Sequence, residues 1–190
     1  ALDTFHGSQP DEAGIDSARL RRLVAPTLAA AIWRALVDAL VVDGALVRHG
    51  AWLHRPGHRV EPDADERALL DRLHPLLVAG RFDPPWVRDL AAKVGIDEER
   101  VRRSLRKASV LGEVHQVVRD LFYARECVDE LAAIVRTLAG DAPLEAARLR
   151  DALGLGRKRT IQLLEYLDRV GYTRRVRDAH VLRGDGGGMA

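Results

Sequence analysis

Leu90-Ala-Ala-Lys-Val-Gly-Ile96 and Leu149-Arg-Asp-Ala-Leu-Gly-Leu155 are the stretches that decide the fold, because the second repeats the pattern of the first. Their glycines lie 59 residues apart, and so do the next glycines, Gly112 and Gly171. A basic amphipathic stretch separates the two glycines of each pair. An internal repeat of this length indicates an array built from one supersecondary unit.

Each repeat predicts helices followed by a pair of short strands. In the last repeat, the apolar residues of a first helix recur at helical spacing: Val128, Leu131, Val135 and Leu138. A second helix ends at Gly154 and a third at Gly171, since glycine takes the left-handed conformation that stops a helix. Strand-forming runs follow, at 113–118 with 121–123 and at 172–176 with 180–183. A degenerate earlier copy carries a short hairpin around Gly50. This order is typical of a helix-turn-helix with a wing.

The predicted fold is therefore mainly α-helical with small β-wings, as a tandem array of three winged-helix modules. We place the first module at 1–62, the second at 63–126 and the third at 127–185, with 186–190 as a flexible glycine-rich tail. Pro56-Gly57 and Pro62 mark the first junction. The junction at 125–127 contains no glycine or proline, so we expect the second wing to run straight into a helix and couple two modules rigidly. We expect an elongated monomer.

The composition fits a folded chain and excludes several protein classes. The 190 residues (21.0 kDa) are 47% hydrophobic and 31% charged, which is typical of a globular protein. No run of 18 apolar residues exists, so we expect no membrane span. Residues 1–10 lack the basic start and apolar core of a signal peptide. The lone Cys127 cannot form an internal disulfide, which favours a reducing cytoplasmic location.

Basic residues are concentrated in the third module. The net charge is only +2, but residues 148–183 hold ten bases against four acids, whereas 1–62 and 63–126 are each balanced. Arg157, Lys158 and Arg159 fall at the start of a predicted helix, where backbone N–H groups and the helix dipole favour phosphate. Further bases lie on or beside the predicted wing: Arg174, Arg175 and Arg177. Helix start and wing together predict a nucleic-acid face, with a solvated basic surface as the alternative.

Further residues of the third module are candidates for contact with bases. The helix face directed away from the core is predicted to consist of Arg159, Gln162, Tyr166 and Arg169. Tyr172 and His180 carry rings that can stack on an unpaired base or form hydrogen bonds with it. Packing of these two rings inside the wing is the competing interpretation. In the second module, three acids at 97–99 precede the basic residues of the third helix, which favours an ordinary solvated helix.

Nothing in the sequence indicates catalysis, a metal site or a nucleotide site. His49, His54 and His58 lie on a predicted hairpin and its exit, without a cysteine or a nearby carboxylate pair, so we expect no metal. Residues 154–160 lack the Gly-Lys-Ser/Thr ending and the preceding buried strand of a phosphate loop. No catalytic residues stand out. We therefore expect a binding module that is not an enzyme and holds no cofactor of its own.

Several separate motifs carry a family resemblance that spans nearly the whole chain. In chain order they are Ala45-Leu-Val-Arg-His-Gly-Ala-Trp-Leu-His54 with Pro56-Gly-His-Arg59, Phe82-Asp-Pro-Pro-Trp-Val-Arg-Asp-Leu-Ala91, Gly112-Glu-Val-His-Gln-Val-Val-Arg-Asp-Leu-Phe-Tyr123, and Gly156-Arg-Lys-Arg159 with Leu163-Leu-Glu-Tyr-Leu-Asp-Arg-Val-Gly-Tyr-Thr-Arg-Arg175. They resemble the carboxy-terminal part of the bacterial selenocysteine-specific elongation factors, the SelB family.

The resemblance implies a translational GTPase that delivers selenocysteinyl-tRNA to the ribosome at a recoded UGA codon. It implies that GTP and Mg²⁺ belong to a portion before residue 1. The winged helices would bind the mRNA hairpin called the SECIS element, with the third module as the reader and the earlier modules as an arm. It carries the binding role onto Arg157, Lys158, Arg159, Arg174 and Arg175.

The shape of RNA sets the expected mode of binding. The major groove of A-form RNA is too narrow for a helix, so we expect the helix start and the wing to grip hairpin phosphates while an unpaired base is contacted nearby. Two alternatives remain. One is a DNA-binding winged-helix transcription regulator, with its third helix in the major groove, and the other is a protein-interaction array.

Overall fold

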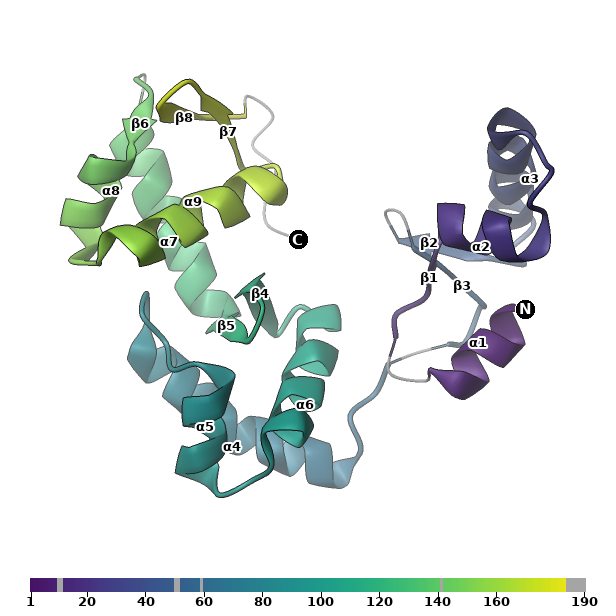
Figure 1. Cartoon of the computed structure of the whole chain (residues 1–190), viewed down its shortest axis with the longest axis horizontal. Helices are drawn as coiled ribbons and strands as arrows, with labels where there is room; N and C mark the ends of the chain where they lie inside the picture. The colour runs from purple at the N-terminus through teal and green to yellow at the C-terminus, as the bar shows by residue number, and fades with distance from the viewer. Residues whose placement is uncertain (10–11, 50–51, 59, 141, 184–190) are drawn as a thin grey trace. The chain divides into compact units, whose positions relative to one another are not determined.

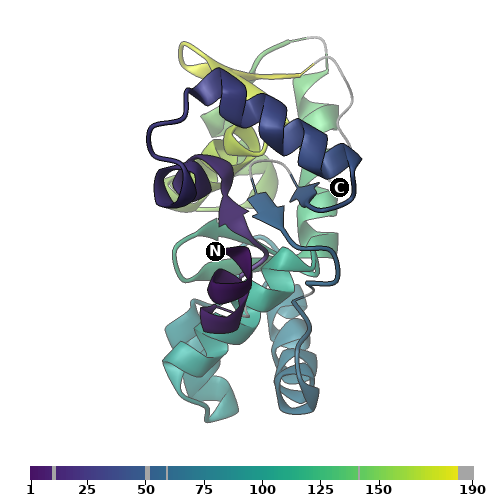
Figure 2. The same cartoon turned by 90° about the vertical axis from the view of Figure 1, so that its right-hand side faces the viewer.

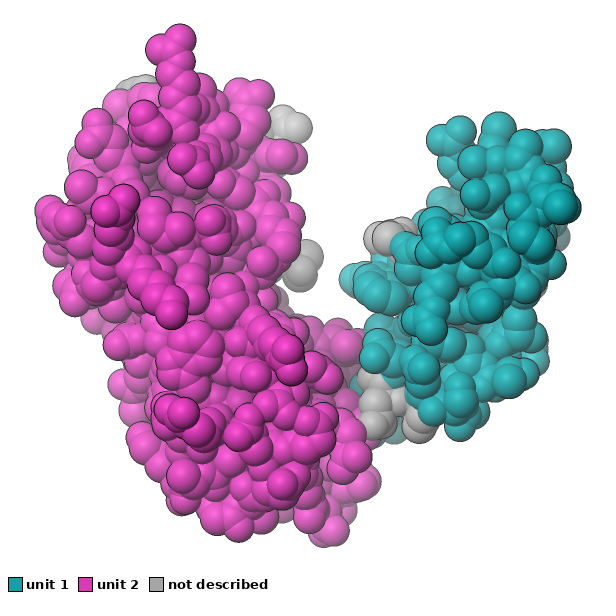
Figure 3. All heavy atoms as spheres, viewed as in Figure 1, with its two compact units in different colours: residues 1–61 teal, residues 62–190 magenta. Residues whose placement is uncertain are grey.

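The computed structural model describes residues 1–9, 12–49, 52–58, 60–140 and 142–183. Within these ranges the chain forms three winged-helix modules made of helices and short antiparallel hairpins (Figure 1). It divides into two compact units, unit 1 at residues 1–61 and unit 2 at residues 62–190 (Figure 3). Unit 1 is the first module, and unit 2 contains the second and third. The predicted tail at 186–190 lies outside the described residues.

Unit 1 is a small winged helix. Its elements are α1 (Leu2–Ser8), β1 (Ile15–Asp16), α2 (Ser17–Val24), α3 (Ala30–Val42), β2 (Val47–His49) and β3 (Trp52–His54). The sheet order is β1-β3-β2. The strands β2 and β3 confirm the hairpin predicted around Gly50, although Gly50 itself lies outside the described residues. A few apolar side chains form the core, among them Ile15, Leu20, Trp33, Val37 and Leu53.

The second module begins at a capped helix. Its elements are α4 (Ala64–Gly80), α5 (Val87–Val94), α6 (Glu98–Val110), β4 (Val114–Val118) and β5 (Leu121–Ala124). Asp63 and Glu66 form a capping box at the start of α4, each side chain accepting from the backbone N–H of the other residue. Asp97 caps α6 by accepting from the N–H groups of residues 99 and 100.

The third module repeats this order and adds a short strand. Its elements are α7 (Arg125–Ala139), β6 (Leu144–Glu145), α8 (Ala146–Leu153), α9 (Arg157–Arg169), β7 (Thr173–Val176) and β8 (Ala179–Leu182). The sheet order is β6-β8-β7. Gly154 follows α8 with a φ of 65°, which confirms the predicted left-handed stop and turns the chain sharply into α9.

The wing of the second module is buried on both faces. Side chains alternate along β5, so Phe122 and Ala124 join the core of the second module while Leu121 and Tyr123 join that of the third. All four are fully buried. Figure 1 shows β4 and β5 between the helices of the two modules, and Figure 2 shows the same chain turned by 90°. The next helix, α7, begins directly after β5, as the absence of glycine and proline at this junction predicts. The last two modules are thus one body.

Candidate nucleic-acid interface

A groove in the third module lies where α8, the start of α9 and the wing meet. Its volume is about 370 Å³, within the range of ordinary ligand sites. We call it the wing groove, and it is lined by Ala146, Ala147, Arg150, Arg157, Thr160, Ile161, Arg175 and Asp178. Alanine and isoleucine side chains form apolar walls, and three arginines and one aspartate supply charge. Two of the predicted residues, Arg157 and Arg175, therefore line one groove.

The start of α9 offers backbone donors together with positive charge. Gly156 is its N-cap and has no side chain to accept the first N–H groups, and the first turn holds no acid. Arg157 and Lys158 are exposed there, and neither forms an ion pair with another described residue. Free N–H groups, the helix dipole and two unpaired cations make this turn suitable for a phosphate.

The wing presents its arginines on two faces. Arg175 shares a face with Thr173 and lies opposite His180 in the ladder, on the side directed at the helices. Arg174 points to the other face. The Arg175 Nε donates to the backbone oxygen of Arg177 at 3.0 Å, which restrains its guanidinium. All three arginines are exposed. The wing therefore supplies charge to the groove and to the outer surface.

A second hollow continues around the tip of the wing. Its volume is about 770 Å³, and it shares Ala146, Ala147 and Asp178 with the wing groove. Val176 and Arg177 of the wing line its other side. The two hollows therefore border the same residues at the start of α8 and at the wing tip.

The position of Arg159 does not agree with its predicted place on the nucleic-acid face. Its guanidinium donates to Asp83 at 2.7 Å and lies over the ring of Trp86 at 5.1 Å. Only 12% of its side chain is exposed. Asp83 and Trp86 belong to the second module, so Arg159 joins two modules and does not lie on the exposed face. Its contact with RNA stays a prediction.

Two further residues of the predicted outward face of α9, Tyr166 and Arg169, also contact the second module, although Arg169 stays exposed. Tyr166 is buried, and its hydroxyl forms a hydrogen bond with Nδ1 of His115, at 2.8 Å. Arg169 donates to the backbone oxygen of Val117 at 2.6 Å. Gln162 on the same face is half-buried. Burial raises the pKa of Tyr166 to about 12 and lowers the pKa of His115, so a tyrosine hydroxyl meets a neutral imidazole. This face holds two modules together and cannot read a groove.

Tyr172 packs against α7, and His180 packs against the end of α9. The Tyr172 hydroxyl donates to the backbone oxygen of Ala132 at 2.9 Å, and its ring packs on the core of the third module. His180 is only 6% exposed, and its Nδ1 lies 3.0 Å from Asp168. Both rings thus have the intramolecular partners that the competing interpretation, packing, predicts, and their contact with an unpaired base stays a prediction.

Six of the groove residues were not predicted, and three of them bear on its chemistry. Arg150 and Asp178 were counted in the charge of residues 148–183 but given no role, and Ile161 was assigned to the core. Ile161 is in fact 36% exposed and lines the wing groove. The repeat could have shown that Ile161 is exposed. The residue 59 positions earlier is Arg102, and an arginine at the equivalent position indicates a surface site.

In the second module, the residue equivalent to Ile161 closes the space between the helix and the wing. Arg102 forms ion pairs with Glu98 and Glu99 at the start of α6 and with Asp120 at the wing turn. Only 11% of its side chain is exposed. The hydrogen bond from Arg102 lowers the pKa of Asp120. Where the third module has Arg157, Lys158 and Ile161, the second has two acids and an arginine that fastens the wing tip to the helix.

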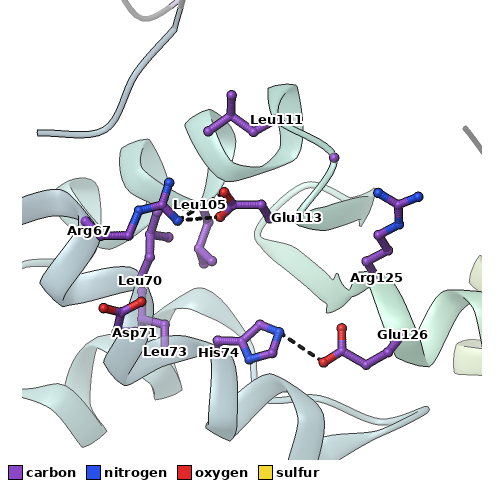
Figure 4. Close-up of a pocket in the computed structure, with 11 residues that line it drawn as sticks. Arg67, Leu70, Asp71, Leu73, His74, Leu105, Leu111, Glu113, Arg125 and Glu126 are labelled. Atoms are coloured by element: carbon purple, nitrogen blue, oxygen red, sulfur yellow. Dashed lines mark hydrogen bonds and ion pairs between the residues drawn. The ribbon is translucent and has the colours of Figure 1, made fainter.

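A groove of about 380 Å³ does exist elsewhere in the second module, between α4, the turn after α6 and the start of α7 (Figure 4). Its charges are paired across it. Arg67 binds Glu113 at 2.8 Å and His74 lies 3.0 Å from Glu126. This balanced lining offers an anion no excess of positive charge.

The described residues were also compared with a metal site, a membrane span and a phosphate loop. Among those residues, no three His, Cys, Asp or Glu side chains are arranged to hold a metal ion. His6 and His58 stack at 3.7 Å between ring centroids. No helix in the described part of the chain is both long and apolar enough to cross a bilayer. Residues 154–156 form the turn between α8 and α9, and residues 157–160 form the first turn of α9. The stretch does not follow a buried strand as a phosphate loop does.

Three family models match the chain, one for each module. The models for residues 1–54 and 136–182 are both described as "Elongation factor SelB, winged helix". The model for residues 63–123 is described as "Selenocysteine-specific elongation factor, winged helix domain". The three matched ranges fall one in each predicted module.

Curated relatives and a solved structure agree with these matches. The selenocysteine-specific elongation factors of Escherichia coli (strain K12) and Haemophilus influenzae are 37% and 30% identical over 183 and 184 residues. Each alignment covers 96% of this chain but only 29% and 30% of the relative, so the chain spans less than a third of their length. The solved mRNA-binding domain of elongation factor SelB from E. coli, in complex with SECIS RNA, is 39% identical with a TM-score of 0.59, covering 64% of this chain and 98% of that one.

Proposed function

Because this chain belongs to the SelB family of selenocysteine-specific elongation factors, and holds three of its winged helices, we propose that it binds the mRNA hairpin called the SECIS element. The observation that carries the proposal is the wing groove of the third module. There an uncapped helix start and a wing bring unpaired arginines to one apolar hollow. The likeness to a domain solved with SECIS RNA supports the same ligand class.

The groove suits a hairpin better than a plain duplex. A-form RNA has a major groove too narrow for a helix, and its sequence is read mostly at unpaired bases. The exposed Arg157 and Lys158 grip phosphates on one side of the hairpin, and Arg174 and Arg175 grip them on the other. An unpaired base then rests on the apolar wall formed by Ile161.

The rival role in reading duplex DNA is disfavoured by how α9 is covered. A DNA-binding winged helix lays the outer face of its third helix in the major groove. In this chain Tyr166 and Arg169 on that face contact the second module. The side of α9 left exposed carries Lys158, Ile161 and the acid Glu165, and the acid would repel phosphate.

In the longer factor, binding of the hairpin would tether delivery of selenocysteinyl-tRNA to a ribosome at a recoded UGA codon, in the cytoplasm. GTP and Mg²⁺ would serve the segments of the relatives that this chain does not span, since residues 154–160 do not fit a phosphate loop. This chain would contribute binding and not catalysis, as a monomer, and the first module with the second would form the arm that carries the third.

The test compares RNA hairpins with DNA. The whole chain is titrated with a SECIS-type RNA hairpin that has an unpaired base, and with a DNA duplex, at several salt concentrations. We expect the hairpin to bind more tightly. Arg157→Ala and Arg175→Ala should each weaken binding and reduce the slope of log K against log salt by about one ion.

The matched control is Arg88→Ala, which removes an arginine of the second module that is 79% exposed. It should leave both the affinity and the salt slope unchanged. Equal binding of RNA and DNA would contradict the proposal. So would an Arg88→Ala effect as large as that of the two groove substitutions.

A further inference from the structure

A single carboxylate fastens both strands of the third wing to α9. Asp168, the second-last residue of that helix, accepts a hydrogen bond from the Thr173 hydroxyl at 2.6 Å. Its other oxygen lies 3.0 Å from Nδ1 of His180. Thr173 begins β7 and His180 lies in β8. Both partners are buried, at 1% and 6% exposure, so solvent does not compete strongly for these bonds.

This anchor acts on the strand that carries the groove arginine. Thr173 and Arg175 share the face of β7 that is directed at the helices, and Arg175 lies directly opposite His180. Residues two positions apart along a strand are separated by about 7 Å. Holding Thr173 and His180 therefore fixes, from two sides, the piece of backbone from which Arg175 reaches the wing groove.

The second module fastens its wing in a different place. There Arg102 of α6 binds Asp120 in the wing turn, which closes the space between helix and wing at the tip. In the repeat, Ile161 stands at the position of Arg102 and Ser109 stands at the position of Asp168. The third module thus lacks the bond at the tip and has one at the base instead.

We propose that Asp168 is a positioning residue that holds the wing of the third module from its base, so that the groove at the tip stays open and Arg175 faces Arg157 across it. The inference rests on the proposed function, because its benefit is realised only when RNA binds. If the wing is already held in the arrangement that binds RNA, less conformational entropy of the strand and its arginines is lost on binding. The base anchor gives this rigidity without filling the groove.

Substitution of Asp168 distinguishes a positioning role from a simple effect of charge, because the two predict opposite changes in RNA affinity. Removing an acid near an RNA site strengthens binding if only charge matters. We expect Asp168→Ala to weaken binding of the SECIS-type hairpin to the whole chain, by about three- to tenfold, the factor that corresponds to ordering one or two long side chains. The matched control is Glu165→Ala, which removes an exposed acid one turn earlier on α9 and should leave binding equal or slightly tighter.

A double-mutant cycle separates positioning from general destabilisation. The loss caused by Asp168→Ala should nearly vanish when Arg175→Ala is already present, and it should persist in full beside Lys158→Ala, because Lys158 does not depend on the wing. Hydrogen exchange without RNA should quicken at the β7 and β8 amides and stay unchanged in α9. Thr173→Val, which removes one of the two bonds, should show the same pattern at smaller size, and serves if Asp168→Ala does not fold.

Each outcome decides one hypothesis. If the unaltered chain does not bind the hairpin, the proposed function fails, and the exchange data still report whether Asp168 holds the wing. If the chain binds and Asp168→Ala binds equally or more tightly, the positioning role is overturned. A loss of the same size with and without Arg175 overturns it too.

Discussion

Ile161→Arg offers the sharpest test of the wing groove, because it gives the third module the residue that closes the same position in the second. Arg102 there binds the wing-turn residue Asp120 and is 11% exposed. In the third module, Ile161 and Asp178 line one groove, so the new arginine would meet an aspartate across it. Ile161 is 36% exposed, so the substitution should change the free energy of unfolding by no more than about 0.5 kcal/mol.

The expected effect on RNA binding follows from what the closed groove would exclude. Loss of the apolar contact between an unpaired base and Ile161 costs on the order of 1 kcal/mol, at about 25 cal/mol per Å² of apolar area, which is a loss of about fivefold in affinity. A hairpin without the unpaired base should show no such loss. Charge alone predicts the opposite, since an added arginine beside RNA tightens binding and steepens the salt slope.

The assay is fluorescence anisotropy with the whole chain and two hairpins, with and without the unpaired base, at two salt concentrations. Ile161→Gln is the control, since it has no charge to attract Asp178. Combining Ile161→Arg with Asp178→Ala should reopen the groove and restore most of the affinity. Tighter binding of either hairpin by Ile161→Arg alone would refute the reasoning that the groove must stay open.

Three further substitutions test the intramolecular roles of residues outside the groove. Arg159→Ala should lower the free energy of unfolding by about 1–2 kcal/mol in urea, since it loses Asp83 and the ring of Trp86, while the salt slope of RNA binding stays unchanged; a slope lower by one ion would return Arg159 to the RNA face. Tyr172→Phe should cost about 0.5–1.5 kcal/mol of stability through its lost hydrogen bond and affect both hairpins equally, and a loss confined to the hairpin with the unpaired base would contradict this. Burial lowers the pKa of His115 in the folded chain, so the unfolded chain takes up that proton first, and stability should fall as the pH drops below about 6.5. His115→Gln should flatten this part of the stability curve in denaturant titrations at pH 7 and about 5, and a curve as steep as that of the unaltered chain would assign the effect to other groups.

The elements of the fold were largely predictable from local patterns. Glycines at helix ends, such as Gly154, act through backbone geometry that does not depend on neighbours. The absence of glycine and proline at 125–127 predicted a rigid junction. In the structure β5 is followed directly by α7, with no loop residue between them. In the site, the exposed residues at the start of α9 and on β7 were predicted correctly as one basic cluster, since the repeat places a helix start beside a wing.

The repeat, the winged-helix order and the module with excess positive charge follow from the amino-acid sequence, because each depends on spacing or on counting along the chain. Tertiary structure alone decided which polar residues face solvent. The helical period shows that Arg159, Tyr166 and Arg169 point away from the core of their own module. It cannot show that they bind the previous module, at Asp83 before α5 and at His115 and Val117 of β4. It likewise cannot show that His180 turns inward to Asp168. Amphipathic spacing describes one element against one core, and a residue's final surroundings depend on every element that packs against it.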